Sequence, residues 1–340
     1  MSMIRIGVVG IGSLGEMHVA NVQNHVMDAE VVAVCARHKD RVEEIQKKYN
    51  VPHGYTSYDE MLEQEEMDAV MIVTGVTAHK EQCIKAAKKG LHIFCEKPLA
   101  SSVEECREIE QAVEENKGKV FLLGYMRRSD KAYAEAMRRV RAGEIGDVII
   151  YKGVGLDPAS VLGPHIEGVR EGKYKPFFVE MASHDADLAL WFLGSEMESV
   201  YAVGGAYVEK GFADYDDYDN AMAVARFKNG SCAFFQVGRT HNSSHVETEI
   251  IGTKGTIRVN NIPDISRLEI FDERGYVRNL EQSFLERWAD TFIREANDFV
   301  ACIKGEKQPE ISVYDGAKSM KMVEMMQRAY VENRVVRADE

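Results

Sequence analysis

The chain has 340 residues, of which 45% are hydrophobic and 29% charged, and its formal net charge at pH 7 is −13. This length accommodates two domains, and the acidic balance argues against a nucleic-acid partner, which would need clustered Lys and Arg. No apolar run approaches the ~20 residues that span a bilayer, and the N-terminus "MSMIRIGVVG" lacks the features of a signal peptide. The 6 cysteines are scattered without C-x-x-C spacing, so we expect reduced thiols and a cytoplasmic protein that binds neither nucleic acid nor membrane.

Strand-like and helix-like runs alternate over the first part of the chain. Strands are predicted at 4–9, 31–35, 69–73, 92–95 and 120–123, with helical stretches such as "RVEEIQKKYN" and "HKEQCIKAAKKG" between them. Another helix is predicted at "SSVEECREIE", where each Ser has a Glu three residues later, as in a capping box. Short apolar strands that alternate with helices predict a parallel, doubly wound sheet, and we place this first domain at 1–123.

After residue 124 the pattern changes. A helix at "SDKAYAEAMRRVRAG", a strand near 148–154 and a helix at about 179–193 precede successive strands between 198 and 271. The pair Asn229-Gly230 predicts a hairpin turn, and helices are expected at about 284–304 and 315–331. We therefore predict an α/β protein whose second domain, 124–340, is α+β with a large open, mostly antiparallel sheet. The last helix is a candidate to pack back on the first domain.

The segment "IRIGVVGIGSLGEMHV" places three glycines, 10, 12 and 15, in G-x-G-x-x-G spacing. The pattern directly follows a strand and opens a helix, which is the context that makes it informative. There the glycines permit a tight turn and a close approach of the backbone to a pyrophosphate, at the positive end of the helix. The predicted dinucleotide contacts are Gly10, Ile11, Gly12, Ser13, Leu14 and Gly15. A glycine-rich turn without a ligand is the alternative.

The end of the second strand bears on the type of dinucleotide. NAD sites usually carry an acidic residue there for the ribose 2′-hydroxyl, whereas this chain has Ala36 followed by Arg37 and His38. The missing acid removes repulsion against a 2′-phosphate, which Arg37 could bind. The pattern thus leans slightly to NADP. NAD stays open, because Arg37 and His38 could equally be surface residues beside an NAD site.

Two further segments carry chemistry. In "FCEKPLA", Glu96 and Lys97 stand at the end of a strand, where ligands of open α/β sheets bind. In "PFFVEMASHDADLALWFLG", a helical period places Glu180, His184 and Asp187 on one stripe. A carboxylate one turn from an imidazole can orient it as a base. An exposed, salt-bridged helix face is the alternative, although the flanking aromatic residues favour a buried helix.

Together, the three glycines, the E-K-P run at 96–98 and the helix "VEMASHDADLALWFLG" resemble the glucose-fructose oxidoreductase/inositol dehydrogenase (GFO/IDH/MocA) superfamily. "FCEKPLA", "GYMRRSDKAY" and "RWADTFIREANDFV" are most similar to its bacterial inositol 2-dehydrogenases, and the resemblance covers nearly the whole chain. It implies an NAD(P)-dependent oxidoreductase with a Rossmann domain followed by an open-sheet domain. The implied reaction transfers a hydride between a ring secondary alcohol of a cyclitol or sugar and nicotinamide C4. The resemblance also implies a homodimer or homotetramer.

The resemblance transfers a catalytic role to three positions. Lys97 matches the lysine of the E-K-P motif and would hydrogen-bond the substrate hydroxyl, while His184 matches the catalytic histidine and would take the hydroxyl proton. Glu180 stands where the family usually has Asp, and it would orient His184 or Lys97. Glu96 is expected to support the cofactor or the backbone.

The remaining expected contacts are grouped by ligand. Besides the glycine turn, the cofactor is expected to contact Arg37, His38, Thr74, Val76, Thr77, His79, Glu96, Lys97 and Met126. The substrate is expected to contact Lys97, Arg127, Asp157, Glu180, His184, Asp187 and His241. A helix-start residue without a ligand is the alternative for His79, and an interdomain salt bridge for Arg127. No metal site is expected, since no His/Cys set has ligand spacing.

The substrate region departs from the inositol enzymes. Asp157-Pro158 occupies the place of a His-Arg-Asn-Pro run, and "QVGRTHNSSHVETEI" lacks the tyrosines expected there. A cyclitol or sugar therefore remains the expected class, and the sequence does not single out myo-inositol within it. Two other functions stay open: an NAD-dependent glycosidase that oxidises its sugar transiently, and a non-catalytic dinucleotide sensor. Net nicotinamide reduction separates a dehydrogenase from both.

Overall fold

The computed structural model describes residues 3–172, 174, 176–259, 269–273, 275–278 and 284–340. The chain forms two compact units: unit 1 comprises Met1–Asp130 and Asp290–Met320, and unit 2 comprises Lys131–Ala289 and Lys321–Glu340. The two C-terminal long helices, α10 (Phe284–Ile303) and α11 (Val313–Glu332), each contribute residues to both units. The domain limits expected from the sequence, 1–123 and 124–340, stay a prediction, which separate expression of the two segments would test.

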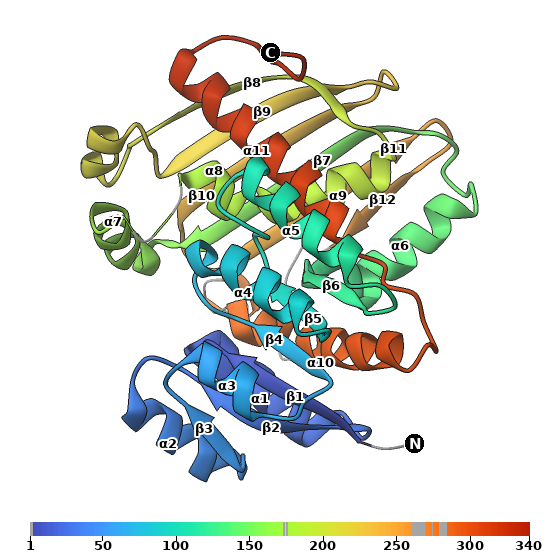
Figure 1. Ribbon diagram of the computed structural model, residues 1–340. Helices are drawn as coiled ribbons and strands as arrows, with labels where there is room; N and C mark the ends of the chain where they lie inside the picture. Colours follow the sequence, from blue (N-terminus) through green and yellow to red (C-terminus); the bar gives the residue numbers. More distant parts are fainter. Residues whose placement is uncertain (1–2, 173, 175, 260–268, 274, 279–283) are drawn as a thin grey trace. The chain divides into compact units, whose positions relative to one another are not determined.

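Unit 1 is built on a six-stranded sheet of order β3-β2-β1-β4-β5-β6, in which all strand pairs are parallel (Figure 1). The strands are β1 (Ile4–Val9), β2 (Ala29–Cys35), β3 (His53–Tyr55), β4 (Ala69–Ile72), β5 (His92–Glu96) and β6 (Phe121–Gly124). Its other helices are α1 (Ser13–His25), α2 (Lys39–Tyr49), α3 (Tyr58–Gln64), α4 (Val76–Lys88), α5 (Val103–Glu115) and the 3₁₀ turn η1 (Met126–Ser129). The parallel doubly wound sheet predicted from the sequence is confirmed; only the short edge strand β3 was missed.

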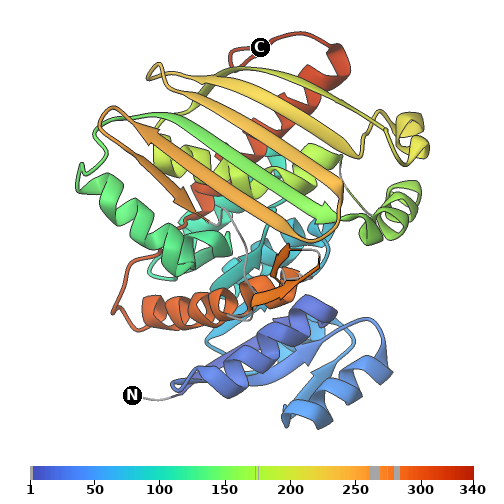
Figure 2. The same ribbon diagram turned by 180° about the vertical axis from the view of Figure 1, so that it is seen from behind.

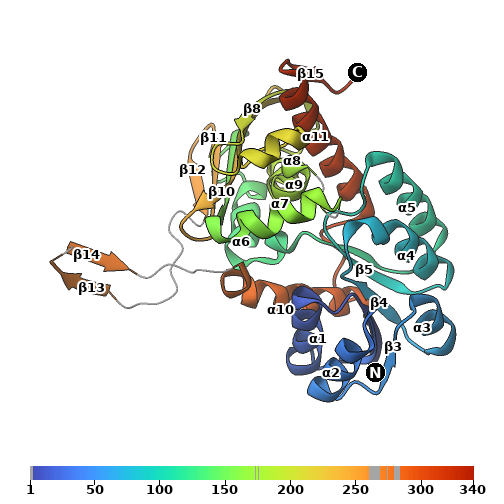
Figure 3. The same cartoon turned by 90° about the vertical axis from the view of Figure 1, so that its left-hand side faces the viewer.

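Helices cover both faces of this sheet, which explains why its strands are almost continuously apolar. Figure 3 shows α1, α2 and α10 on one face, and α3, α4 and α5 on the other. Residues of α10 join the core of β1, β2 and β4, and the ring of Phe299 lies 5.9 Å from that of Phe94 on β5. From α11, the hydroxyl of Ser319 lies 2.5 Å from that of Tyr125, just after β6. The C-terminal part of the chain thus completes the core of unit 1.

Unit 2 is built on a seven-stranded sheet of order β12-β11-β7-β10-β9-β8-β15, antiparallel except for the pair β7–β10. The strands are β7 (Val148–Pro158), β8 (Met197–Gly205), β9 (Asn220–Phe227), β10 (Cys232–His241), β11 (His245–Gly252), β12 (Thr256–Val259) and β15 (Val336–Arg337), and a separate hairpin pairs β13 (Glu269–Asp272) with β14 (Gly275–Arg278). Gly230, at φ +88°, forms the predicted turn between β9 and β10. The expected mostly antiparallel sheet is confirmed.

The helices of unit 2 lie on one face of its sheet. They are α6 (Lys131–Arg141), α7 (Leu162–Arg170), α8 (Phe177–Met181) and α9 (Ser183–Leu193), with 3₁₀ turns η2 (Ala159–Val161) and η3 (Lys210–Tyr215). Helix α9 packs on β7 at Gly153, where a Cβ would lie 2.5 Å from Asp185 Oδ1, and the hydroxyl of Tyr151 donates to the same oxygen over 2.9 Å. Figure 2 shows the opposite face, which no described helix of unit 2 covers. The sheet is therefore open, as predicted.

One predicted element is different in the structure. The single helix expected at about 179–193 is two helices, which meet at Ala182. Ala182 ends α8 and precedes α9 with a backbone at φ −81°, ψ −7°, so the regular helical period does not run through it. Glu180 therefore belongs to α8, and His184 and Asp187 belong to α9. Across the described residues, no helix is long and apolar enough to cross a membrane.

Candidate functional site

The glycine turn between β1 and α1 is shaped by two close contacts. Gly10 has φ +90°, and a Cβ on it would lie 2.5 Å from the carbonyl oxygen of Val73. A Cβ on Gly15 would lie 1.9 Å from the carbonyl oxygen of Gly10. Gly12 is different, since no described heavy atom lies within 4 Å of its Cβ position. The fold itself thus requires glycine at 10 and 15, whereas Gly12 leaves the backbone open to an approaching group.

The start of α1 offers backbone donors to that group. Gly12 is the N-cap and provides no side-chain cap, and the first helical hydrogen bond runs from the amide of Glu16 to Gly12. The amides of Ser13 and Leu14 precede it and are orphans of the helix end, where the dipole favours an anion. Glu16 also lies in this first turn. Hydrogen bonds from Lys48, and to a smaller extent from Arg41, lower the pKa of its carboxyl group to about 2. These residues fit a dinucleotide pyrophosphate.

The residues expected near the ribose lie at the ends of β2 and β4. Arg37 and His38 are exposed, and His38 is the N-cap of α2. Arg41 is committed to the fold, because its Nε donates to the carbonyl of Ile11 over 2.9 Å. Thr74 donates its hydroxyl to Gln82 over 2.6 Å and is half-buried. Val76, at the start of α4, is buried, and Thr77 is exposed.

His79 lies within α4 and is buried. Its Nδ1 lies 2.9 Å from the carbonyl oxygen of Pro98, and its Nε2 lies 2.9 Å from that of Thr74. Burial lowers the pKa of His79, so the neutral ring donates to one of the two carbonyls at a time. His79 thus ties the start of α4 to the segment after β5. Its expected contact with the cofactor stays a prediction.

The end of β5 carries the E-K-P motif. Glu96 is buried; its Oε1 lies 2.7 Å from Nε2 of His18, and its Oε2 accepts the backbone amide of Lys97 over 3.2 Å. Gly124, on the neighbouring strand β6, makes room for this carboxylate, since a Cβ there would lie 3.0 Å from Oε2. Lys97 is half-buried and precedes Pro98 through a cis peptide bond. Glu96 therefore supports the backbone at Lys97.

After β6, the turn η1 buries Met126 and Arg127. The next residue, Arg128, is bound within unit 1, where it donates to the carbonyl of Glu310 over 3.0 Å and to Asp315 over 3.1 Å. Met126 as a cofactor contact and Arg127 as a substrate contact stay predictions.

In unit 2, α8 and α9 carry the second part of the expected site. Glu180 is half-buried, whereas His184 and Asp187 are buried, at 6% and 1% exposure. The helix is therefore not the exposed, salt-bridged face that was the alternative. His184 belongs to unit 2 and Lys97 to unit 1, and their pairing stays a prediction.

The parallel strands β7 and β10 bring other expected residues to one end of their sheet. His241 on β10 is paired in register with Pro158 on β7, next to Asp157. Arg239 donates from Nε to Asp157 over 3.4 Å and lies 4.9 Å from the ring centroid of Phe177. His241 is half-buried, with Nδ1 2.9 Å from the carbonyl of Ser243. Asp157 and His241, two expected substrate contacts, thus lie on adjacent strand ends.

Three further groups nearby are buried: Arg239, which the sequence offered as a possible pocket residue or a solvated one, and His165 and Asp217, which were not expected to be part of the site. Arg239 is 8% exposed, and burial together with Arg239 lowers the pKa of His165 to about 3. Asp217 accepts the amide of Phe177 over 3.0 Å, yet burial raises its pKa to about 6. His165 and Asp217 lie on a helix and a loop whose sequences carry no motif, so only the fold could associate them with the strand ends.

The class of protein follows from unit 1. A six-stranded parallel sheet of this order, whose first strand leads through G-x-G-x-x-G into an uncapped helix, defines a dinucleotide-binding Rossmann fold. Residues 4–125 match the family described as "Oxidoreductase family, NAD-binding Rossmann fold", and residues 133–258 match the "GFO/IDH/MocA C-terminal domain". The chain belongs to this GFO/IDH/MocA oxidoreductase family, which confirms the predicted resemblance.

Relatives and solved structures agree with this assignment over the whole chain. The scyllo-inositol 2-dehydrogenase (NAD(+)) of Bacillus subtilis is 32% identical, with 94% of this chain and 92% of that protein covered. The myo-inositol 2-dehydrogenase of Thermotoga maritima is 29% identical, with 99% of each covered. The crystal structure of scyllo-inositol dehydrogenase from Lactobacillus casei with bound NAD(H) and scyllo-inositol superposes with a TM-score of 0.96, at 29% identity, and covers 100% of both chains.

Two predictions are decided by these findings. The chain is an oxidoreductase, as predicted, and the family description supports NAD as its dinucleotide. The predicted slight preference for NADP is not supported by these findings. Its premise was the missing acid after β2, and exposed Arg37 and His38 are compatible with either dinucleotide.

Proposed function

We propose that the protein is an NAD-dependent dehydrogenase that oxidises a ring secondary alcohol of a cyclitol or sugar of the inositol type. The observation that supports it most is the likeness over the full chain to inositol dehydrogenases, one of which was solved with NAD(H) and scyllo-inositol. Two features of this chain agree with it: a backbone cradle for a pyrophosphate and an intact E-K-P motif.

The catalytic roles are assigned to three residues. When bound, the nicotinamide would accept the hydride from the substrate carbon. The ammonium of Lys97 donates a hydrogen bond to the substrate oxygen and stabilises the negative charge that develops on it. His184 accepts the hydroxyl proton as general base, and Glu180 orients His184 or Lys97. In the reductive direction, the same proton returns from His184 to the substrate oxygen.

The cofactor and substrate contacts belong to the same proposal. The segment Gly10 to Gly15 holds the pyrophosphate. The nicotinamide half of the cofactor contacts Thr74, Val76, Thr77, His79, Glu96, Lys97 and Met126. The adenosine ribose contacts Arg37 and His38. For the substrate, Arg127, Asp157, Asp187 and His241 join the catalytic residues, since a ring with many hydroxyls needs several convergent polar groups. A homodimer or homotetramer in the cytoplasm stays a prediction, and analytical ultracentrifugation would test its oligomeric part.

The first experiment incubates the purified protein with a panel of cyclitols and aldoses and either NAD or NADP, and follows absorbance of the reduced cofactor. We expect NAD reduction with at least one cyclitol. Hydrolysis of a glycoside without net reduction would instead indicate the NAD-dependent glycosidase. Binding of NAD without turnover of any substrate would indicate the sensor.

The second experiment tests the catalytic pair. Lys97→Ala and His184→Ala should each lower kcat by about 100-fold or more, the range of general acid–base catalysis, while NAD still binds. Matched controls are Lys39→Ala and His25→Ala, which remove exposed side chains of the same types. Turnover by either catalytic variant at the rate of its control would refute that assignment.

A further inference from the structure

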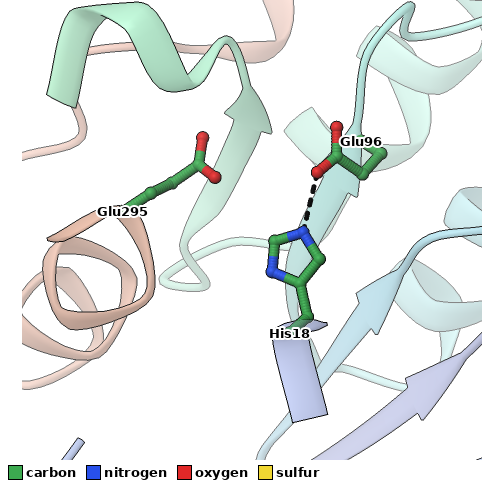
Figure 4. Close-up of side chains that lie close together, drawn as sticks. All are labelled: His18, Glu96 and Glu295. Atoms are coloured by element: carbon green, nitrogen blue, oxygen red, sulfur yellow. Dashed lines mark hydrogen bonds and ion pairs between the residues drawn. The ribbon is translucent and has the colours of Figure 1, made fainter. Parts of the chain in front are cut away.

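Three ionisable side chains meet in the interior of unit 1. His18 comes from α1, Glu96 from the end of β5 and Glu295 from α10, and their exposed fractions are 0%, 5% and 0%. One nitrogen or oxygen atom of each lies within 4.8 Å of the others. Figure 4 shows the carboxyl group of Glu295 directed toward His18 and Glu96. The function proposed above uses Glu96 as a cofactor contact and as support for the backbone of Lys97, and it gives His18 and Glu295 no role.

Some polar atoms of this cluster have a hydrogen-bond partner, and others have none among the described residues. Nε2 of His18 lies 2.7 Å from Oε1 of Glu96, so that pair is satisfied. Neither carboxyl oxygen of Glu295 has a hydrogen-bond partner among the described residues, and the same holds for Nδ1 of His18. A buried polar atom without a hydrogen-bond partner costs free energy. We therefore expect a further group or a proton to complete the hydrogen bonds of these atoms.

The surroundings of Glu295 disfavour a negative charge. The ring of His18 lies 5.2 Å from that of Phe94 and 5.6 Å from that of Phe292, so the space beside the cluster is lined by aromatic side chains. The charged groups that act on Glu295 are Glu96, across the cluster, and Asp298, on the same helix, and both are acidic. Burial, followed by these two carboxylates, raises the pKa of Glu295 well above its usual range.

A proton or a divalent cation could neutralise Glu295, and the geometry favours the proton. A cation shared by Glu96 and His18 would take over atoms of the bond that already joins them. A proton on Glu295 leaves that bond intact and creates an O–H donor. When a neutral His18 donates from Nε2 to Glu96, its Nδ1 is an acceptor, so the two orphaned groups complement each other.

We propose that Glu295 is a neutral carboxylic acid and a positioning residue, whose O–H is linked to Nδ1 of His18 through one buried water. His18 then donates from Nε2 to Glu96, and Glu96 accepts the amide of Lys97. These hydrogen bonds connect the end of β5 to α10, which lies about 200 residues later in the sequence. The effect on turnover rests on the proposed role of Lys97, whereas the protonation state does not depend on it.

Glu295→Gln tests the protonation state, because glutamine keeps the shape and the donor of a neutral acid but cannot ionise. The folded-state pKa is raised, so the wild type loses stability as pH rises above the unfolded value of 4.5 toward the folded one. The midpoint of thermal unfolding of E295Q should therefore rise relative to wild type as pH increases from 5 to 8. Asp290→Asn, an exposed position of α10, is the control and should show no such trend.

Infrared spectroscopy and metal analysis give independent readouts. The wild type should show the C=O band of a buried protonated carboxyl group at neutral pH, and E295Q should lack it. Either a midpoint difference that is constant with pH or the absence of that band would overturn the proposal. One divalent metal ion per purified chain, lost in E295Q, would overturn it in favour of a cation site.

Activity then tests the positioning role. E295Q should keep kcat within about twofold of wild type, whereas Glu295→Leu, which lacks the donor, should lower kcat at least tenfold with the KM for NAD unchanged. Equal kcat in E295L and E295Q would refute the positioning role. If the protein reduces no nicotinamide with any substrate, the proposed function fails, while the infrared and unfolding results still decide the protonation state.

Discussion

The glycine turn permits a paired test, because Gly12 and Gly15 are three residues apart yet have opposite surroundings. A Cβ on Gly15 would lie 1.9 Å from the carbonyl oxygen and 2.8 Å from the carbonyl carbon of Gly10. Both atoms are backbone, so the start of α1 must move away from β1. Overpacking of this kind costs about 1–3 kcal/mol, occasionally more. We expect Gly15→Ala to lower the free energy of unfolding by at least this amount.

Gly12→Ala should leave stability almost unchanged. Its backbone has φ −67°, which any residue adopts, and its Cβ position is free of described atoms within 4 Å. Alanine is a somewhat poorer N-cap than glycine, a difference of less than about 1 kcal/mol. The added methyl group would, however, stand where the pyrophosphate approaches the backbone. A loss of about 1.4 kcal/mol in NAD binding corresponds to a tenfold rise in Kd, and we expect at least that.

Urea unfolding and calorimetric titration with NAD measure the two effects separately. The reasoning requires that G15A lose stability and that G12A lose NAD affinity while it unfolds like the wild type. NAD binding by G12A with unchanged Kd would refute the assignment of this turn to the pyrophosphate. A G15A variant as stable as the wild type would show that the contact with Gly10 is not tight in solution.

Three further predictions concern buried groups of unit 2. The pKa of Asp217 is raised from 3.8 to about 6, so its contribution to stability is full below 3.8 and is lost as pH rises through 6. Relative to wild type, Asp217→Asn should therefore gain about 2 kcal/mol between pH 4 and 7, and urea unfolding at both values that gave no gain would contradict the shift. Tyr151→Phe should cost about 1–3 kcal/mol, because it removes the buried hydrogen bond that the Tyr151 hydroxyl donates to Asp185, and an unchanged urea midpoint would refute this. Asp219 accepts the amides of residues 207–209, so Asp219→Ala should speed proteolysis near η3; unaltered cleavage would count against that role.

The sequence predicted those parts of the fold that local patterns encode. The strands of unit 1 are mostly apolar runs, and the helix α5 is capped by Ser102, whose hydroxyl accepts the amide of Glu105 as the capping pattern predicts. The break at Ala182 was missed because alanine favours a helix and the apolar spacing continues on both sides of it. The short strand β3 has three residues and too little pattern to be recognised.

Long-range contacts lay beyond those patterns. The bond between His18 and Glu96 joins residues 78 positions apart, and nothing in "GEMHVANV" distinguishes this histidine from one on an ordinary helix. The amphipathic pattern of α10 predicts a buried face but does not say against which sheet. For that reason, the carboxyl group of Glu295 could not be associated with β5 from the sequence. In the same way, the expectation of no metal site was based on the sequence spacing of His and Cys residues. Sequence spacing cannot reveal residues that are far apart in the chain and come together only in the fold.

The backbone around Lys97 is held by two neighbouring side chains, those of Glu96 and His79. Oε2 of Glu96 accepts the backbone amide of Lys97, and His79 lies at hydrogen-bond distance from the carbonyl of Pro98. Lys97→Ala should therefore remove the ammonium while it keeps these two backbone contacts, whereas His79→Ala should leave the ammonium in place but loosen its backbone. If Lys97 is catalytic as proposed, the first variant should lose kcat, and the second should lose both kcat and stability. A His79→Ala variant with normal kcat would show that the carbonyl of Pro98 needs no partner, and that Glu96 alone positions the lysine.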